Sequence, residues 1–358
     1  SGETPPVSIL KPLRGLDEES YENLSSFARQ SYPTFEILFG AVSPDDPALE
    51  VARAVARDFP GVSVRIFDRV ERAGENPKVN TLASLAREAV HPLILLSDSD
   101  VRVAPDYVLA MVRELDFEDA SMLTSLYSSR ARSWAGRFEA LGTATEFQPG
   151  VLVARMLQRV RFGLGAGILI RREALDAIGG FPAIANHLAD DYMLGDLCDR
   201  SGGRVELSTA VVEHCLGSPS TGDWIRRQVR WNRGIRVSRP AGYFGLVLTQ
   251  GVAAAALFLA VSGGSTLGWG VFAATTGVRL AAATIVGGRF LKDPTVRGFF
   301  WLIPLRDLAG TVLWAAGLFG KTVEWRGQRY RLNRDGRISN AAASLLPSSR
   351  GGLRKDGR

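Results

Sequence analysis

The chain has 358 residues, which is enough for one large domain or two smaller ones. Its 43 basic and 37 acidic residues leave a net charge of +6. This excess is too small to predict a nucleic-acid partner by itself, and an anionic membrane surface fits it equally well. The two cysteines, Cys198 and Cys215, exclude a disulfide framework and a cysteine metal site and are compatible with a reducing compartment. Residues 1–6 carry no signal peptide, so we expect the protein either to begin here or to have a leading segment that this sequence does not include.

The composition changes sharply near residue 240. Charges are frequent before this point, whereas residues 240–278 contain none. This stretch is too long for one membrane span and long enough for two short ones, and Gly263-Gly264-Ser265 near its middle predicts a tight turn. We therefore expect a soluble domain over residues 1–222 and a membrane region over residues 240–320.

The first half of the chain alternates apolar strand patterns with helical patterns. The expected strands are residues 7–10, 35–40, 62–67 and 92–96, and the expected helices are residues 18–30, 49–59 and 76–90. Such alternation at 20- to 30-residue spacing predicts an α/β fold with a doubly wound, mainly parallel sheet. Farther on, the pattern indicates strands at 120–128 and 168–170, helix plus loop at 134–160 and a helix at 172–178.

Polar side chains follow three of these strands. Lys11 ends the first strand, Asp45 and Asp46 follow the second, and Asp98 and Asp100 follow the strand at 92–96. In an open α/β sheet, ligands collect beyond the carboxyl ends of the strands, and two carboxylates there can hold a divalent cation and through it a diphosphate. Two plainer interpretations remain open, because Asp and Ser are ordinary turn residues and one of Asp45 and Asp46 is expected to cap the next helix.

Two further segments carry candidate site residues. The glycines of residues 163–167 allow either a close approach of the backbone to a ligand or only a flexible entry to a strand. Asp190 and Asp191 open an apolar helix, and their spacing alone favours compensation of the helix dipole over catalysis. The lone His187 is expected to be structural.

A basic amphipathic helix is predicted over residues 223–239, directly before the membrane region. One face of this helix carries Arg226, Arg230 and Arg233. The residues that could anchor it in the interface are Trp224, Trp231 and Ile235. This pattern is typical of a helix lying on a membrane surface. A sharper hypothesis is that Arg227 and Arg230 bind a diphosphate leaving group.

These segments occur together in an order that resembles the family-2 type glycosyltransferases, most of all the ceramide glucosyltransferases and their bacterial relatives that glycosylate hopanoids. The resemblance covers roughly residues 7–335 and is carried by KPLRG at 11–15, DDPA at 45–48, NPKVN at 76–80, DSD at 98–100, ADDY at 189–192, RQVRW at 227–231 and WRGQRYRL at 325–332. Each motif is weak, but their order is specific. The leading transmembrane helix common in this family is absent from the sequence.

The resemblance implies a GT-A type nucleotide-sugar-binding domain. Asp46, with Asp45 as the alternative, matches the acid that contacts the uracil and ribose. Asp98 matches the second signature acid and shares a Mg²⁺ or Mn²⁺ with Asp100, although some relatives carry a non-acidic residue at the latter position. Asp191 matches the catalytic base. The remaining expected donor-binding residues are Lys11, Lys78, Arg227, Arg230 and Trp231.

The same resemblance implies transfer of a hexose, glucose or N-acetylglucosamine, from a UDP-sugar to a lipid hydroxyl, with inversion at the anomeric carbon. Ceramide and a hopanoid polyol are both plausible acceptors. Two other classes stay open: a non-enzymatic membrane scaffold or transporter subunit, and a metal-dependent nucleotidyltransferase. A scaffold would not explain charged residues at three strand ends, and release of UDP as opposed to pyrophosphate would separate the two enzymes.

The hydropathy pattern predicts two full spans, residues 241–262 and 264–286. A third apolar stretch, residues 298–320, is interrupted by Arg306 and Asp307, and we expect it to lie in the interface or to re-enter the membrane from the cytoplasmic side. The segments before, between and after these stretches are basic, including residues 321–358, and positive charge marks cytoplasmic segments.

This pattern predicts a multi-pass protein with its catalytic domain and a basic tail in the cytoplasm, and the resemblance to the bacterial relatives implies a bacterial inner membrane. Arg279 falls inside the second expected span. Its charge would be costly there unless it faces protein or reaches the interface.

Overall fold

The computed structural model describes residues 4–325 and 327–341. An eight-stranded sheet has the order β3-β2-β1-β4-β7-β6-β8-β5. Its strands are β1 (Val7–Leu13), β2 (Phe35–Ala41), β3 (Ser63–Phe67), β4 (Leu93–Leu96), β5 (Val101–Arg102), β6 (Met122–Ala131), β7 (Ile168–Arg171) and β8 (Val205–Gly217). The four strands β3, β2, β1 and β4 are mutually parallel, as expected. Beyond β4 the sheet is mixed, because β7 runs antiparallel to both β4 and β6.

Helices cover both faces of this sheet. They are α1 (Ser20–Ala28), α2 (Ala48–Asp58), α3 (Pro77–Glu88), α4 (Tyr107–Phe117), α5 (Trp134–Gly142), α6 (Gln148–Leu157), α7 (Arg172–Ala177) and α8 (Asp190–Arg200), with a π-helical turn at Thr143–Phe147 joining α5 to α6. Apolar residues of α1, α2 and α4 form one core with the sheet, and those of α3, α7 and α8 form another. Strands buried from two sides need nearly continuous apolar runs, which is why β1, β2 and β4 were visible in the sequence.

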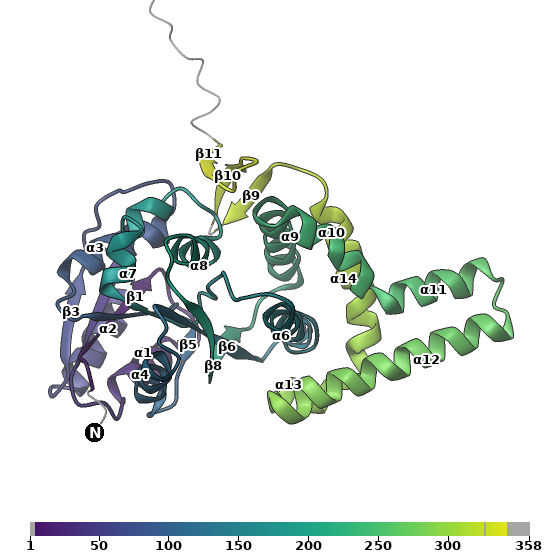
Figure 1. Ribbon diagram of the computed structural model, residues 1–358, viewed down its shortest axis with the longest axis horizontal. Coiled ribbons are helices and arrows are strands. Elements are labelled where there is room, and N and C mark those ends of the chain that lie inside the picture. The colour runs from purple at the N-terminus through teal and green to yellow at the C-terminus, as the bar shows by residue number, and fades with distance from the viewer. Residues whose placement is uncertain (1–3, 326, 342–358) are drawn as a thin grey trace, which may run out of the picture.

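The carboxyl-terminal part begins with α9 (Thr221–Ser238), which confirms a helix over most of residues 223–239. It continues with α10 (Pro240–Gly245), α11 (Gly251–Val261), α12 (Thr266–Ala283), α13 (Pro294–Phe299) and α14 (Ile303–Gly317). In Figure 1, α11 and α12 form an antiparallel hairpin that projects away from the domain of the eight-stranded sheet, and α14 runs across the base of this hairpin.

Two helical stretches, Thr266–Phe290 and Pro294–Gly317, are long and apolar enough to cross a membrane. The pair Pro240–Thr249 and Gly251–Val261 qualifies only together, because a 54° bend separates its two halves. The expected first span, residues 241–262, is therefore a broken helix. The third apolar stretch has the length of a span by itself, so the expected number of crossings stays a prediction.

The turn between α11 and α12 satisfies its own polar groups. Gly263 and Gly264 adopt positive φ angles of 63° and 74°, and their amides donate to the carbonyls of Ala260 and Leu259. The Ser265 hydroxyl accepts a bond from the Gly268 amide. Since backbone groups in a bilayer must find partners within the protein, this turn is suited to an apolar environment.

A small second sheet consists of β9 (Thr322–Trp325), β10 (Gln328–Leu332) and β11 (Ile338–Asn340). Its last strand returns to the large domain, where the Leu188 amide donates to Gly336 O and the Ile338 amide donates to Asn186 O. The expected tail over residues 321–358 thus begins as a folded sheet. Residues 342–358 lie outside the described residues.

Candidate active site

Three segments meet around the ammonium group of Lys78. Lys78 lies in the first turn of α3, where the Asn76 side chain caps the helix. Its Nζ is 2.7 Å from Asp98 Oδ1 at the end of β4 and 3.2 Å from Asp190 Oδ2 at the start of α8. Burial lowers the pKa of Lys78, but the charges of Asp190 and Asp98 raise it more, so the net shift is upward. Lys78 is therefore a permanent cation at the end of β4.

Asp191 is held by backbone amides on both of its oxygens. The Gly165 amide donates to Oδ2 at 2.9 Å and the Tyr192 amide donates to Oδ1 at 2.8 Å. Burial, together with the neighbouring charge of Asp190, raises the pKa of Asp191 to about 6, although Lys78 and the amides lower it. A carboxyl group with a pKa near the working pH can accept a proton in a reaction.

Gly165 brings Asp98 and Asp191 together. A Cβ atom at this position would lie 3.1 Å from Asp98 Oδ2, 3.1 Å from Lys78 Nζ and 3.4 Å from Asp191 Oδ2. Any side chain would therefore fill the space between the two carboxylates. The glycine-rich segment allowed a close backbone approach from sequence alone, but nothing in it singled out Gly165.

Lys11 supports the turn that carries Asp98. Its side chain is fully buried, with Nζ 3.9 Å from the centre of the Phe27 ring, and donates to Ser97 Oγ and to the carbonyl oxygen of Asp98. Burial lowers the pKa of Lys11 to about 7, although the charges of Asp98 and Asp100 raise it. A direct contact with the donor stays a prediction, since these bonds give Lys11 a role through Asp98.

Asp46 holds two loops together at the neighbouring strand end. Both of its oxygens accept the Gly15 amide, at 2.9 and 3.0 Å, and Oδ1 also accepts the Ala48 amide at the start of α2. Sequence reasoning expected one of the two acids at the N-cap of this helix, but Pro47 holds that position, and Asp46 bonds the first helical amide from the residue before it. Asp45 is exposed, and a nucleotide contact by either acid stays a prediction.

Asp100 faces a histidine that sequence reasoning missed. His214 Nε2, on β8, lies 3.2 Å from Asp100 Oδ2. Burial lowers the pKa of His214, but the Asp100 charge raises it more, so the net shift is upward. The strand β8 was itself not predicted, and so this partner was not visible.

The arginines of α9 reach toward the same region. Arg227 forms an ion pair of 3.2 Å with Glu139 of α5, whose side chain is 1% exposed. Burial raises the pKa of Glu139, while Arg227, His214 and Arg230 oppose the shift. Arg230 lies 6.0 Å from the Trp231 ring and 5.8 Å from the Trp325 ring. Sequence reasoning found the arginines but not Glu139, which is 88 residues away.

The described residues contain no cluster of three histidine, cysteine or carboxylate side chains that could enclose a metal ion. Asp98 and Asp100 nevertheless offer a fitting pair of ligands. Mg²⁺ at nucleotide sites is held by one or two carboxylates, with phosphate oxygens and water completing the shell. The donor set therefore suits a cation that arrives with a diphosphate.

The sequence of this chain is similar to those of known glycosyltransferases. The model of the family described as Glycosyl transferase family 21 matches residues 1–338. Ceramide glucosyltransferase 1 of Caenorhabditis elegans is 27% identical over 351 residues, covering 95% of this chain and 74% of the relative. Ceramide glucosyltransferase 3 of the same organism is 27% identical over 349 residues, covering 93% and 74%.

Among solved structures, the mannosyltransferase PcManGT from Pyrobaculum calidifontis, in complex with GDP-Man and Mn²⁺, has a TM-score of 0.55 at 18% identity. The match covers 88% of this chain and 86% of that one. At this identity the likeness is one of fold, and it confirms the expected GT-A type domain. Because the family model covers nearly the whole chain, the protein belongs to glycosyl transferase family 21 and is a glycosyltransferase.

Proposed function

We propose that this enzyme transfers a hexose from a UDP-sugar to a hydroxyl of a membrane lipid, with inversion of the anomeric carbon. The observation that carries the proposal is the pairing of Asp191 with Asp98 across Gly165. One carboxylate is tuned to accept a proton, and the other lies at the strand end where a nucleotide diphosphate binds in α/β folds. Donor and acceptor would thus meet at one glycine.

On the acceptor side, Asp191 is the general base. It takes the proton of the lipid hydroxyl while the hydroxyl oxygen bonds to the anomeric carbon. The bond from that carbon to the diphosphate oxygen breaks, and UDP leaves with the electron pair. A single displacement inverts the centre, so an α-linked donor yields a β-glycoside. A general base contributes roughly 10²–10⁴ in rate.

On the donor side, Asp98 and Asp100 would hold Mg²⁺ or Mn²⁺, and when bound the cation offsets negative charge on the diphosphate. The Mn²⁺ in the PcManGT complex supports this assignment. Lys78, Arg227 and Arg230 supply fixed positive charge for the leaving group.

The other predicted donor residues have supporting roles. Asp46 orders the Gly15 loop, where the uracil and ribose would lie, and Asp45 stays the alternative contact. Lys11 positions Asp98 through its carbonyl oxygen. Trp231 lies beside Arg230 and orients its guanidinium.

The named relatives and the membrane region support a lipid acceptor. The relatives are ceramide glucosyltransferases. The bent pair Pro240–Thr249 and Gly251–Val261 follows directly on α9, and the two helical stretches long enough to span a membrane come after it. We propose that the catalytic domain faces the cytoplasm of a bacterial inner membrane, that residues 241–262, as one bent span, and residues 264–286 cross the bilayer, and that α14 lies along its surface. The course of α14 across the base of the α11–α12 hairpin supports this arrangement (Figure 1).

The test is a matrix of donors and lipids with the product mass measured. UDP-glucose and UDP-N-acetylglucosamine would each be combined with ceramide, with a hopanoid polyol and with soluble sugars. We expect a glycolipid and an equal amount of free UDP. Pyrophosphate release would indicate a nucleotidyltransferase, and efficient transfer to soluble sugars alone would refute the lipid acceptor.

A further inference from the structure

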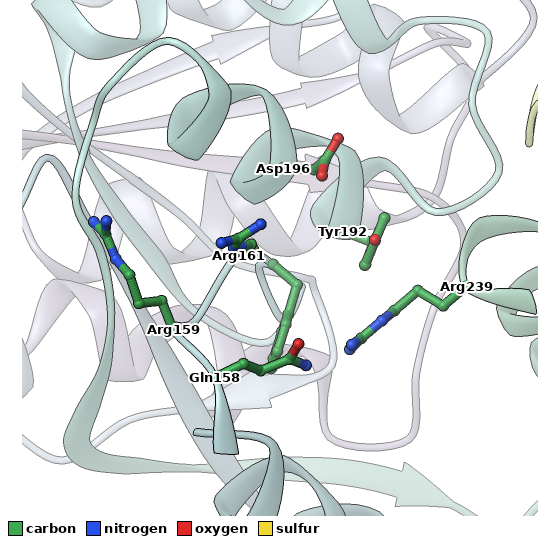
Figure 2. Close-up of a pocket in the computed structure, with 7 residues that line it drawn as sticks. Gln158, Arg159, Arg161, Tyr192, Asp196 and Arg239 are labelled. Atoms are coloured by element: carbon green, nitrogen blue, oxygen red, sulfur yellow. The ribbon is translucent and has the colours of Figure 1, made fainter. Parts of the chain in front are cut away.

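A basic cavity lies beside the proposed active site, and none of the predicted donor-binding residues lines it. Its volume is about 190 Å³, several times the ~30 Å³ that one water molecule takes up in the liquid. It is lined by Gln158, Arg159, Arg161, Phe162, Tyr192, Asp196 and Arg239. Figure 2 shows Arg239 extending from the end of α9 toward Gln158, with Arg161 lying below Asp196.

Positive charge exceeds negative charge around this cavity. Asp196 is paired with Arg200 at 2.8 Å, and Asp199 is paired with Arg161 at 3.4 Å. Among the described residues, Arg159 and Arg239 form no ion pair with a carboxylate.

Three arginines and one carboxylate act on the hydroxyl group of Tyr192. Burial and Asp196 raise the pKa of Tyr192, whereas Arg239, Arg200 and Arg161 lower it. An anion of matching size would be attracted to this side of the cavity.

Exposed apolar side chains flank the cavity along the chain. At the end of α6, immediately before Gln158, Met156 is 85% exposed and Leu157 is 82% exposed. Beyond Arg239, at the start of the membrane region, Val247 and Leu248 are 51% and 87% exposed. Side chains of this kind enter the acyl layer of a membrane, while arginines between them stay at the level of the head groups.

We propose that this cavity binds the phosphodiester of an anionic glycerophospholipid. Arg161 and Arg239 contact the phosphate, Tyr192 donates its hydroxyl, and Met156 and Leu248 lie against the acyl chains. The lipid is a resident ligand and not the glycosyl acceptor, so the proposal does not depend on which lipid receives the sugar. It would anchor the part of the catalytic domain next to Asp191 to the bilayer.

The test is native mass spectrometry of the full chain in detergent, titrated with phosphatidylglycerol or phosphatidylcholine. This readout requires no turnover, so its failure is distinct from a failure of the proposed function. We expect the protein to retain phosphatidylglycerol at least tenfold more tightly than phosphatidylcholine. Since each arginine near a membrane surface contributes about 1 kcal/mol, the double variant Arg161→Gln/Arg239→Gln should bind phosphatidylglycerol roughly 30-fold more weakly.

A matched control removes two exposed arginines on the other side of the sheet, Arg57→Gln on α2 and Arg113→Gln on α4. This control should bind like the unmodified chain, and both variants should keep its unfolding temperature. Equal retention of the two lipids, or unchanged retention by the Arg161/Arg239 variant, would overturn the proposal. Displacement of phosphatidylglycerol by an equal concentration of inorganic phosphate would overturn the lipid assignment and indicate a site for free phosphate.

Discussion

Two clusters of buried charge differ in their balance. The site cluster, Lys78 with Asp98, Asp190 and Asp191, has one cation and three carboxylates. The helix cluster has two arginines and two carboxylates: Arg279 bonds both oxygens of Asp307 at 2.7 and 3.0 Å, and Arg306 pairs with Glu146.

This difference in charge balance distinguishes a cluster that stabilises the structure from a cluster that binds a ligand. A buried charge is costly unless it is paired, so the balanced helix cluster can hold α12 and α14 against the catalytic domain without a ligand. The site cluster has excess negative charge that a bound cation would compensate. Imbalance between buried charges therefore indicates a ligand site, and four variants test this distinction.

The largest effect is expected from the base. Asp191→Asn should lower the transfer rate by roughly 10³ or more while leaving donor affinity nearly unchanged, because an amide cannot accept the proton of the acceptor. The measurement is kcat at saturating donor together with UDP-sugar binding. Asp116→Asn on α4, whose carboxylate pairs with Arg171 outside both sites, is the control and should transfer at the normal rate. If Asp191→Asn kept its transfer rate and lost donor binding, Asp191 would have to be reassigned to the donor side and another residue to the role of base.

The second variant addresses the metal. Asp98→Asn should lower turnover by about 10²- to 10³-fold and weaken UDP-sugar binding when metal is present, since one of the two proposed carboxylate ligands is removed. Isothermal titration with and without Mn²⁺ measures the coupling between metal and donor. Full activity of the unmodified enzyme in excess EDTA would remove the metal from the proposal.

The third variant breaks the balanced cluster. Asp307→Asn leaves Arg279 without its ion-pair partner and should lower the free energy of unfolding by about 3 kcal/mol. Donor affinity should be unchanged, because no residue of this cluster lies in the site cluster. The charge-reversed pair, Arg279→Asp with Asp307→Arg, should recover part of the stability in thermal unfolding in detergent. A loss of donor binding in folded Asp307→Asn would mean that the two clusters are coupled.

The smallest effect is a shift in pH dependence. Asp191 has a raised pKa of about 6, so the basic form is present above this pH and is lost as the pH falls through it. Asp190→Asn removes a negative charge that raises this pKa. The acidic limb of the rate profile should therefore move to lower pH by about one unit or less, up to tenfold at pH 5. A shift to higher pH would show that Asp190 acts on the base mainly through Lys78.

The sequence predicted the parts of the molecule that depend on local pattern. Buried parallel strands and capped helices leave continuous apolar runs and signals such as Asn76-Pro77, and these placed Asp98, Lys78 and Asp191 on their elements. The likeness to known glycosyltransferases supplied the roles that spacing alone did not, because Asp190-Asp191 resembles an ordinary helix start.

Long-range partners could not be predicted in this way. Glu139, His214 and Gly165 each meet a site residue through the fold, and no periodicity records which strand neighbours which. The half-exposed β8 alternates too irregularly for a strand to be recognised. For Arg279 the sequence predicted only that it must face protein or reach the interface, and its partner Asp307 came from the packing of two helices.

The return of β11 to the large domain has a consequence for biosynthesis. The loop before Asp190 and Asp191 receives two of its backbone partners, Gly336 O and the Ile338 amide, from the β10–β11 connection and from β11, which leave the ribosome after all the apolar helices. Chains are made from the amino terminus and their domains fold in that order. The GT-A core can therefore form early, whereas Asp191, the proposed base, acquires its final support only when the apolar helices have been synthesised. A nascent chain would therefore contain a folded GT-A domain before the loop that carries Asp191 is complete, and we expect it to be inactive until β11 has been synthesised.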